Sequence, residues 1–310
     1  MTIREKVALA PLTSYHIGGE ADYFAEPETI EDLTAVTTWL RQHPQPYYLL
    51  GDGTNVLFSS QGYRGLIIKP NFKNIIFSDQ IVTVGCNYKL ADLLDESLRH
   101  NLIGLEFTAG IPGSVGGAIY GNAGMYGQAM SDVVTQVVTF DLQSQKIETR
   151  YREALEFSYR HSQFKAMQNT VIVEVSLKLK HGDVEVSKKI IAEWLERRHT
   201  NHPTEPSAGC AFKNVPLTTE IEAQCQKLGL DIERFKQHRK IPTAFLIDQL
   251  DLKGKTVGGA VVSPKHANYI INKGTATSED VITLMSLIKQ QVRDAYGIQL
   301  EEEVQLVTSS

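Results

Sequence analysis

The chain has 310 residues, of which 42% are apolar and 22% are charged, as is ordinary for a soluble globular protein. This length predicts roughly two domains with well-buried cores. The formal charge of −5 and the isoelectric point near 6.0 leave no overall electrostatic footprint for nucleic acid or an acidic membrane, so small-molecule partners are favoured.

The number of cysteines and the lengths of the apolar segments indicate in which cellular compartment the protein is found. Cys86, Cys210 and Cys225 are odd in number and widely spaced, which fits a reducing environment better than a disulfide framework. The first residues lack a long apolar run, and nowhere do about 18 uncharged apolar residues follow one another. We expect a cytoplasmic protein that does not enter a membrane.

The first half of the chain mixes helices and short strands without regular alternation. Residues 28–43 place Ile30, Leu33, Val36 and Leu40 at helical spacing, which predicts an amphipathic helix. Short strands are predicted at 47–50, 56–58, 65–69, 74–77 and 81–85, then a helix at 89–100 and strands at 133–140 and 171–180. The absence of regular βαβ units predicts mixed α and β structure.

A charged helix at 186–199 leads into a segment that reads as a domain joint. Residues 200–209 (TNHPTEPSAG) contain two prolines and several small residues, which favour a linker. Beyond it we expect a helix at 218–229, strands at 256–262 and 268–272, a helix at 278–296 and a closing strand at 298–307. These elements predict a second, smaller α/β domain.

Residues 108–127 (TAGIPGSVGGAIYGNAGMYG) hold seven of the 23 glycines of the chain. Glycine permits positive φ and lets backbone N–H groups approach an anion such as a pyrophosphate, although a loop of tight turns also uses glycine. Residues 50–58 (LGDGTNVLF) have the same character, with Thr54 and Asn55 able to add side-chain hydrogen bonds. Neither stretch matches a Rossmann fingerprint, and residues 249–256 (QLDLKGKT) fail as a Walker A motif because Gln249 occupies the first glycine position. We therefore predict that two loops together hold the phosphates.

Seven segments, in this order, resemble UDP-N-acetylenolpyruvoylglucosamine reductases, the flavoenzymes of bacterial cell-wall precursor synthesis. They run from about Ser14 to Val304, and the length of the chain resembles the shorter form of that family. The segments are TSYHIGGEADYF, LGDGTNVLF, GLEFTAGIPGSVGGAIYGNAGMYG, FSYRHSQFK, PSAGCAFKN, GGAVVSPKHANYIIN and IQLEEEV.

The resemblance implies an α+β fold. A two-lobed FAD-binding module of the vanillyl-alcohol oxidase type is expected over 14–182, a connecting helix and linker over 183–202, and a smaller α/β substrate-binding domain over 203–310. It also implies that both glycine-rich stretches wrap the FAD pyrophosphate and the edge of the flavin ring. The flavin contacts implied are Gly51, Gly53, Thr54, Asn55, Gly110, Ile111, Pro112, Gly113, Ser114, Gly116, Gly117, Asn122 and Gly124.

The implied reaction has two halves. NADPH passes a hydride to the flavin, and the enolpyruvyl ether of UDP-N-acetylglucosamine then takes that hydride at its terminal carbon and a proton at the carbon bearing the carboxylate. The cofactors are therefore FAD and NADPH, and the product is UDP-N-acetylmuramate. The protein must position the substrate, stabilise an enolate-like carboxylate and deliver one proton.

Three residues are expected to carry this chemistry. Arg160 matches the arginine of the family and can bind two carboxylate oxygens with its planar fork. Cys210 occupies the place of the proton-donating serine in the pattern GSxFK, and a thiol, with an ordinary pKa of about 8.5, gives up a proton more readily than a hydroxyl. Glu303 matches the last glutamate of the pattern LEPEV.

Strand alternation complicates the choice of glutamate. Ile298, Leu300 and Val304 share one face with Glu302, whereas Glu303 points to the other. An acid on an apolar face needs a partner, so Glu302 is either the functional residue or the mark of a bulge. We choose Glu303 from the resemblance and keep Glu302 as the alternative.

The rest of the substrate site follows from the same resemblance. Substrate contacts are expected from Arg160, Lys213, Asn214, His266 and Asn268, whereas His202 is left unassigned. The connection over 215–240 is longer than the family pattern leads us to expect, and we interpret it as a helical insertion by the substrate entrance.

Other interpretations remain beside this one. A zinc site at His199, His202 and Cys210 lacks a fourth ligand at a convincing spacing, so no metal is expected. An FAD oxidase of alcohols or hydroxy acids on the same fold, and a nucleotide-sugar binding protein without catalysis, are the two rival functions. The sequence leaves the oligomeric state and the preference for NADPH over NADH open.

Overall fold

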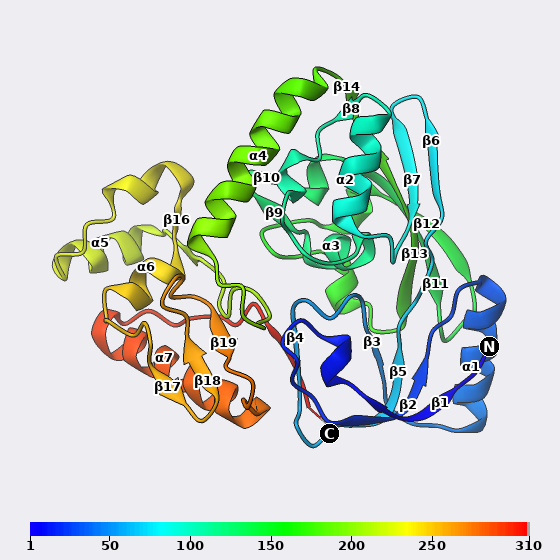
Figure 1. Ribbon diagram of the computed structural model, residues 1–310, viewed down its shortest axis with the longest axis horizontal. Helices are drawn as coiled ribbons and strands as arrows, with labels where there is room; N and C mark the ends of the chain where they lie inside the picture. Colours follow the sequence, from blue (N-terminus) through cyan, green and yellow to red (C-terminus); the bar gives the residue numbers. More distant parts are fainter. Residues whose placement is uncertain (309–310) are drawn as a thin grey trace. The chain divides into compact units, whose positions relative to one another are not determined.

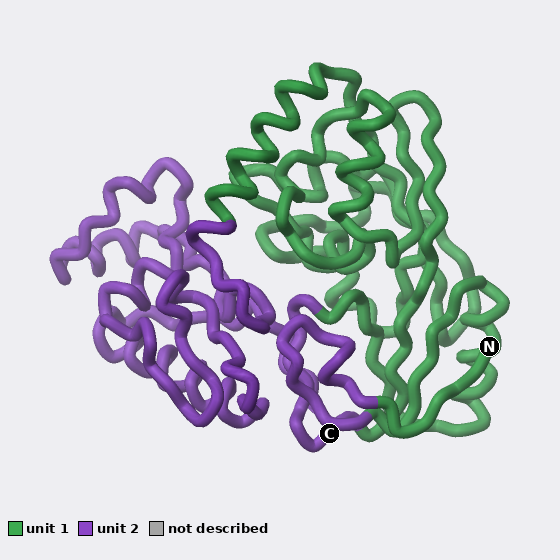
Figure 2. The backbone as a smooth tube through the Cα atoms, in the orientation of Figure 1, with its two compact units in different colours: residues 1–7, 21–53, 64–198 green, residues 8–20, 54–63, 199–310 purple. Residues whose placement is uncertain are grey.

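The computed structural model describes residues 1–308. The chain divides into two compact units, coloured separately in Figure 2. Unit 1 comprises residues 1–7, 21–53 and 64–198, and unit 2 comprises residues 8–20, 54–63 and those from 199 onward. Two short N-terminal segments therefore belong with the C-terminal part of the chain.

The first sheet of unit 1 has four strands and is covered by one helix. Its order is β1 (Arg4–Ala8), β2 (Glu20–Ala25), β5 (Tyr63–Ile68) and β3 (Tyr47–Leu49), with β3 parallel to β5. Helix α1 (Ile30–Gln42) begins at a capping box in which Thr29 and Asp32 bond to each other's backbone N–H. Leu33 and Val36 of α1 then pack in a core with Leu66 of β5, which fixes the helix on this sheet.

The second sheet of unit 1 is antiparallel and carries α2 (Leu90–Arg99) and α3 (Val115–Gly121) on one face (Figure 1). Leu93 of α2 and Ile119 of α3 share a buried core with Val82 and Val175 of the sheet. The strand order is β12 (Ile147–Tyr151), β11 (Val134–Asp141), β13 (Thr170–Lys178), β7 (Ile81–Gly85) and β6 (Ile75–Ser78). Because β13 contributes to the cores of both sheets, it joins the two lobes of unit 1.

Short elements and one long helix complete unit 1. Single turns of 3₁₀ helix lie at Glu106–Thr108, Met130–Asp132, Arg152–Leu155 and Gln163–Ala166. The small strands are β8 (Leu102–Ile103), β9 (Gly124–Met125), β10 (Gln128–Ala129) and β14 (Lys180–His181). Helix α4 (Val184–Asn201) then follows, in green in Figure 1, and unit 1 extends to Arg198 within it.

Unit 2 has its own core, built largely around helix α7 (Ser278–Tyr296). Leu284 and Ile288 of α7 pack in this core with Val262 and Ile270 of a three-stranded antiparallel sheet. The remaining elements are a 3₁₀ turn (Ala10–Leu12), β4 (Val56–Phe58) parallel to β20 (Gln305–Val307), β15 (Val215–Pro216) paired with β16 (Lys240–Ile241), α5 (Thr219–Lys227), a 3₁₀ turn (Glu233–His238), α6 (Thr243–Asp248), β17 (Thr256–Val257), β18 (Ala260–Val262) and β19 (Ile270–Asn272).

Most elements expected from the sequence are confirmed, but two strands are not. Residues 256–262 form a hairpin rather than one strand, because Gly258 at φ +52° turns the chain and pairs Val257 with Ala260. The expected closing strand over 298–307 is regular only in β20. Within the described part of the chain, residues 1–308, no helix is both long and apolar enough to span a membrane.

Candidate active site

The second glycine-rich stretch and residues 50–53 of the first meet in unit 1. One follows β3, and the other forms the seven-residue helix α3, whose N-cap is Ser114. A Cβ placed on Gly51 would lie 3.6 Å from Ser114 Oγ and 3.8 Å from the Cα of Gly117. Asp52 also forms an ion pair with Lys89, which bridges to Ser114 through its backbone. The fold thus brings both predicted loops side by side.

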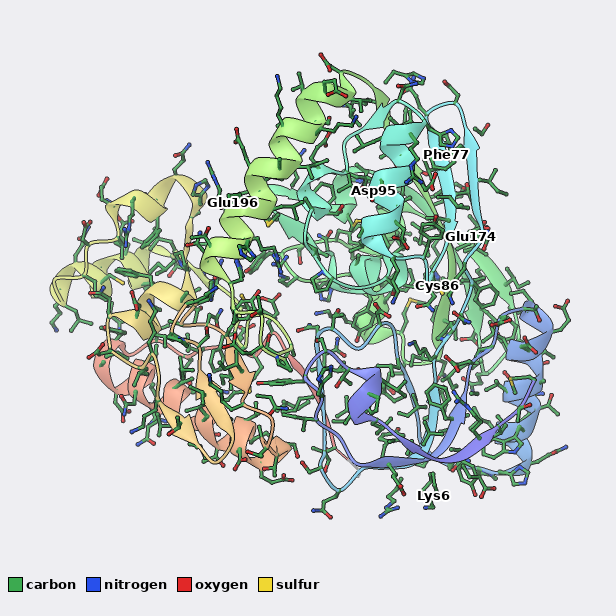
Figure 3. The ribbon with its side chains drawn as sticks, in the orientation of Figure 1. Lys6, Phe77, Cys86, Asp95, Glu174 and Glu196 are labelled. Carbon is green, nitrogen blue, oxygen red and sulfur yellow. The ribbon has the colours of Figure 1, made fainter. Side chains whose placement is uncertain are left out.

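Several glycines of this region are required by the packing of the protein itself. A Cβ on Gly110 would lie 2.6 Å from Cδ of Arg198 on α4, and one on Gly116 would lie 2.8 Å from Cβ of Cys86, a residue labelled in Figure 3. At Gly124 a Cβ would meet the carbonyl oxygen of Gln128 at 2.2 Å. These three glycines let α4, the turn after β7 and the β9–β10 hairpin approach closely.

Other glycines have no such reason within the protein. Gly51, Gly117 and Gly121 do not have positive φ values. A Cβ on Gly117 would come no closer than 3.5 Å to a neighbour, and one on Gly121 would find nothing within 4 Å. Glycine inside a helix costs about 1 kcal/mol relative to alanine, so its presence in α3 indicates a ligand that lies against the bare backbone.

Arg160 lies in a tight turn of unit 1. Its φ is +54°, a left-handed conformation that is uncommon for arginine. Ser158 and His161 on either side exchange two backbone hydrogen bonds of 3.1 Å, and Arg160 Nη1 donates to the carbonyl oxygen of Gly124 at 3.2 Å. The predicted carboxylate-binding arginine is therefore attached to the second glycine-rich stretch.

Cys210 lies in unit 2 and is partly exposed. It pairs with Tyr269 in an isolated antiparallel bridge. The neighbouring segment is fixed by Asn268, whose buried amide accepts from the N–H of Phe212 at 3.0 Å and donates to the carbonyl oxygen of Phe212 at 2.8 Å. Asn268 thus supports the backbone beside Cys210.

Glu303 is attached to the segment of Cys210 on one side and to the first glycine-rich stretch on the other. Its N–H donates to the carbonyl oxygen of Ala211 at 2.9 Å, and its carbonyl oxygen accepts from Asn55 Nδ2 at 3.0 Å. The N–H of Val304 also points to Ala211, at 3.5 Å. Two successive residues opposite one partner make a β-bulge, which ends the expected alternation.

Glu302, beside the bulge, is held through its backbone and its carboxylate. Its backbone bridges to Phe212, and its carboxylate accepts a hydrogen bond from Lys289 Nζ of α7 at 2.6 Å. Partial burial disfavours the ionised carboxylate, but the hydrogen bond from Lys289, a backbone hydrogen bond and the charge of Lys289 together outweigh it, so the pKa of Glu302 lies below its ordinary value. Glu302 therefore has a structural partner.

The expected substrate residues of unit 2 lie in two groups. Lys213 Nζ pairs with Glu301 at 3.0 Å, and the side-chain oxygen of Asn214 accepts from the N–H of Thr243 at 3.3 Å. His266 stacks on His202, with ring centroids 5.0 Å apart, and meets Tyr269 edge to face at 4.7 Å. This ring cluster next to Cys210 is a feature that single-sequence reasoning missed.

Two family models match the chain. One, an FAD binding domain, covers residues 21–146, which contain both glycine-rich stretches. The other, the C-terminal domain of UDP-N-acetylenolpyruvoylglucosamine reductase, covers residues 201–307, which contain Cys210 and Glu303.

Whole-chain relatives agree with these models. A UDP-N-acetylenolpyruvoylglucosamine reductase of Caldanaerobacter subterraneus is 35% identical over 95% of this chain and 90% of its own, and one of Pseudothermotoga lettingae is 36% identical over 95% and 94%. The crystal structure of UDP-N-acetylenolpyruvylglucosamine reductase from Thermus caldophilus is similar at 30% identity, with a TM-score of 0.77 over 99% of this chain and all of that one.

The chain belongs to the UDP-N-acetylenolpyruvoylglucosamine reductase family. The predicted α+β fold with its FAD-binding module is confirmed, and the chain is an FAD-dependent oxidoreductase of this family. The residue roles drawn from the family resemblance stay predictions.

Proposed function

We propose that this chain reduces UDP-N-acetylglucosamine enolpyruvate to UDP-N-acetylmuramate with NADPH, as a step of peptidoglycan precursor synthesis. In this proposal residues 14–182 bind FAD and residues 203–310 bind the substrate. The observation that carries it is the pair of bare backbone surfaces at Gly51 and Gly117, which no protein neighbour requires and which lie side by side within the FAD-binding domain.

In this proposal, individual residues of the chain bind the substrate, stabilise its developing charge and donate the proton. FAD, when bound, supplies the hydride chemistry. Arg160 binds the substrate carboxylate through its guanidinium and stabilises the negative charge that develops there. Its attachment to the carbonyl of Gly124 supports this role, because the arginine is then held by the same stretch that is proposed to hold the flavin.

Cys210 is the proposed proton donor. Its thiol gives a proton to the carbon that bears the carboxylate, and the thiolate left behind recovers a proton from solvent. Glu303 completes the site. The backbone hydrogen bond from Glu303 to Ala211, the residue next to Cys210, supports a shared site for these two side chains.

Flavin absorbance under anaerobic conditions tests the proposal. NADPH is added to the purified holoenzyme first, and UDP-N-acetylglucosamine enolpyruvate second. We expect bleaching by NADPH and rapid recovery with the enolpyruvyl substrate. Recovery with oxygen alone would indicate an oxidase instead, and a folded protein that takes up no FAD would overturn the assignment.

A further inference from the structure

Asn122 ends α3 in a left-handed conformation, with φ +44°, and its side chain is buried. Nδ2 donates to the carbonyl oxygen of Ser158 at 2.9 Å. Oδ1 accepts from the N–H of Ser131 at 3.0 Å. Both ends of this amide are therefore engaged by the protein, although the family resemblance marks Asn122 as a flavin contact.

Ser158 begins the turn that presents Arg160. This turn is closed by the reciprocal backbone hydrogen bonds between Ser158 and His161, and it holds Arg160 at positive φ. A non-glycine residue with this left-handed backbone conformation costs of order 1 kcal/mol of folding free energy, and the conformation persists only where the surrounding structure imposes it. The hydrogen bond from Asn122 is one of the contacts that impose it.

Further contacts come from the residues at and just after the end of α3, and Lys165 Nζ adds a hydrogen bond of 2.8 Å to the carbonyl oxygen of Arg160. Ser162 is fully buried, and its Oγ donates to the carbonyl oxygen of Tyr120 at 2.8 Å. Arg160 Nη1 reaches the carbonyl oxygen of Gly124 at 3.2 Å. The Arg160 turn is thus anchored at Tyr120, Asn122 and Gly124. Of these three, only Asn122 uses its side chain, so on the α3 side only there can a substitution remove an anchor directly; on the turn itself, the hydroxyl of Ser162 supplies another.

We propose that Asn122 is a positioning residue that fixes the Arg160 turn to the flavin-binding stretch and so sets how well the enzyme binds the substrate carboxylate. This proposal rests on the proposed function, because it takes Arg160 as the carboxylate-binding residue. Asn122 acts through Arg160 and needs no contact with flavin or substrate.

The substitution Asn122→Asp tests it with the least disturbance of the backbone. Aspartate has the same size and tolerates left-handed φ, but it replaces the donor to Ser158 with an oxygen that repels the carbonyl. Asn101 is a matched control, because it is an exposed asparagine just after α2 with φ +57°. Asn101→Asp repeats the chemistry of the substitution away from the Arg160 turn.

The readout is the dissociation constant of UDP-N-acetylglucosamine enolpyruvate from the oxidised holoenzyme, measured by calorimetry without NADPH. We expect about tenfold weaker binding for Asn122→Asp, with FAD content and reduction by NADPH as in the wild type, and no change for Asn101→Asp. Equal affinity of Asn122→Asp and wild type would overturn the proposal. If Asn122→Asp does not fold, Asn122→Gly removes the side chain at a φ that glycine accepts, and the same expectation applies.

A double-mutant cycle separates positioning from a general structural effect. In an Arg160→Ala background, we expect Asn122→Asp to change the affinity by less than about twofold, because the group it positions is gone. Additive losses would show that Asn122 does not act through Arg160. Failure of the proposed function gives a different result. The wild-type holoenzyme would then neither bind the enolpyruvyl substrate nor be reoxidised by it, and the positioning proposal would fail as well.

Discussion

Cys210 is the residue at which this chain departs from the serine of the family pattern. A thiol and a hydroxyl can both donate a proton, whereas a methyl group cannot. We therefore expect Cys210→Ser to keep substantial activity and Cys210→Ala to slow flavin reoxidation by the substrate by about 100-fold or more, with reduction by NADPH unchanged. Stopped-flow absorbance of each half-reaction measures this. Equal reoxidation rates in wild type and Cys210→Ala would remove Cys210 from the mechanism.

The ion pair between Lys289 and Glu302 gives a prediction on pH. The folded-state pKa of Glu302 is lowered, so this pair stabilises the fold above the ordinary glutamate pKa of about 4.3 and loses its effect as the pH falls through the folded value. Because the glutamate is partly exposed, we expect Lys289→Met to lower the free energy of unfolding at pH 7 by no more than about 1 kcal/mol.

Urea unfolding at pH 7 and at pH 3 measures this effect. The difference between wild type and Lys289→Met is expected to shrink at the lower pH. Lys188→Met is the control, because Lys188 pairs with Glu185 on the exposed surface of α4 and is expected to contribute almost nothing. A difference for Lys289→Met that stays constant with pH would contradict the assigned cause.

At the scale of the element, α3 contains a glycine that the packing of the protein requires and glycines that it does not. A Cβ at Gly116 would press into Cys86 at 2.8 Å, whereas one at Gly117 would meet only Ser114 Oγ at 3.5 Å. We expect Gly116→Ala to lower the free energy of unfolding of the apoprotein by about 1–3 kcal/mol. Gly117→Ala is expected to leave it unchanged or raise it by up to about 1 kcal/mol, because alanine favours the helix.

The same two variants separate folding from cofactor binding. If FAD lies against the backbone of Gly117, then Gly117→Ala weakens FAD binding although the apoprotein is as stable as the wild type. Thermal unfolding of the apoprotein and fluorescence titration with FAD measure the two effects. Undiminished FAD affinity in Gly117→Ala would place the ligand elsewhere.

The elements show how far the sequence predicts this structure. Helix α7 is found at the predicted residues 278–296 because its apolar spacing, its Thr277 capping box and Gly297 after its end are all local signals. The prediction of one continuous closing strand over 298–307 is wrong, because the bulge that interrupts it depends on Ala211, about 90 residues away in the chain.

The candidate site was predictable only in part for the same physical reason. The composition of the two glycine-rich stretches is enough to predict a bound ligand. The roles of Arg160, Cys210 and Glu303, by contrast, were predicted only from the family resemblance. The supporting hydrogen bonds of Asn55 and Asn122 join residues 248 and 36 positions apart. No local pattern encodes such partners, since only the folded chain brings them together.

At the scale of the whole molecule, each unit has its own buried core, and the three cysteines are divided between them. Cys86 of unit 1 is 6% exposed, and burial raises its pKa to about 12. Cys225 of unit 2 is fully buried, and burial raises its pKa as well. Cys210 is partly exposed. Because alkylation requires an accessible thiolate, the three thiols are expected to differ widely in reactivity.

We therefore expect iodoacetamide at pH 8 to label the native protein at Cys210 first, with Cys86 and Cys225 reacting only after unfolding in urea. Peptide mass spectrometry after short incubations measures each site, and Cys210→Ser serves as the control that takes up no label while folded. If Cys210 lies in the substrate site, UDP-N-acetylglucosamine enolpyruvate slows its labelling. Rapid labelling of Cys86 in the folded protein would mean that the contact between α3 and the turn after β7 opens, and with it the packing that requires glycine at position 116.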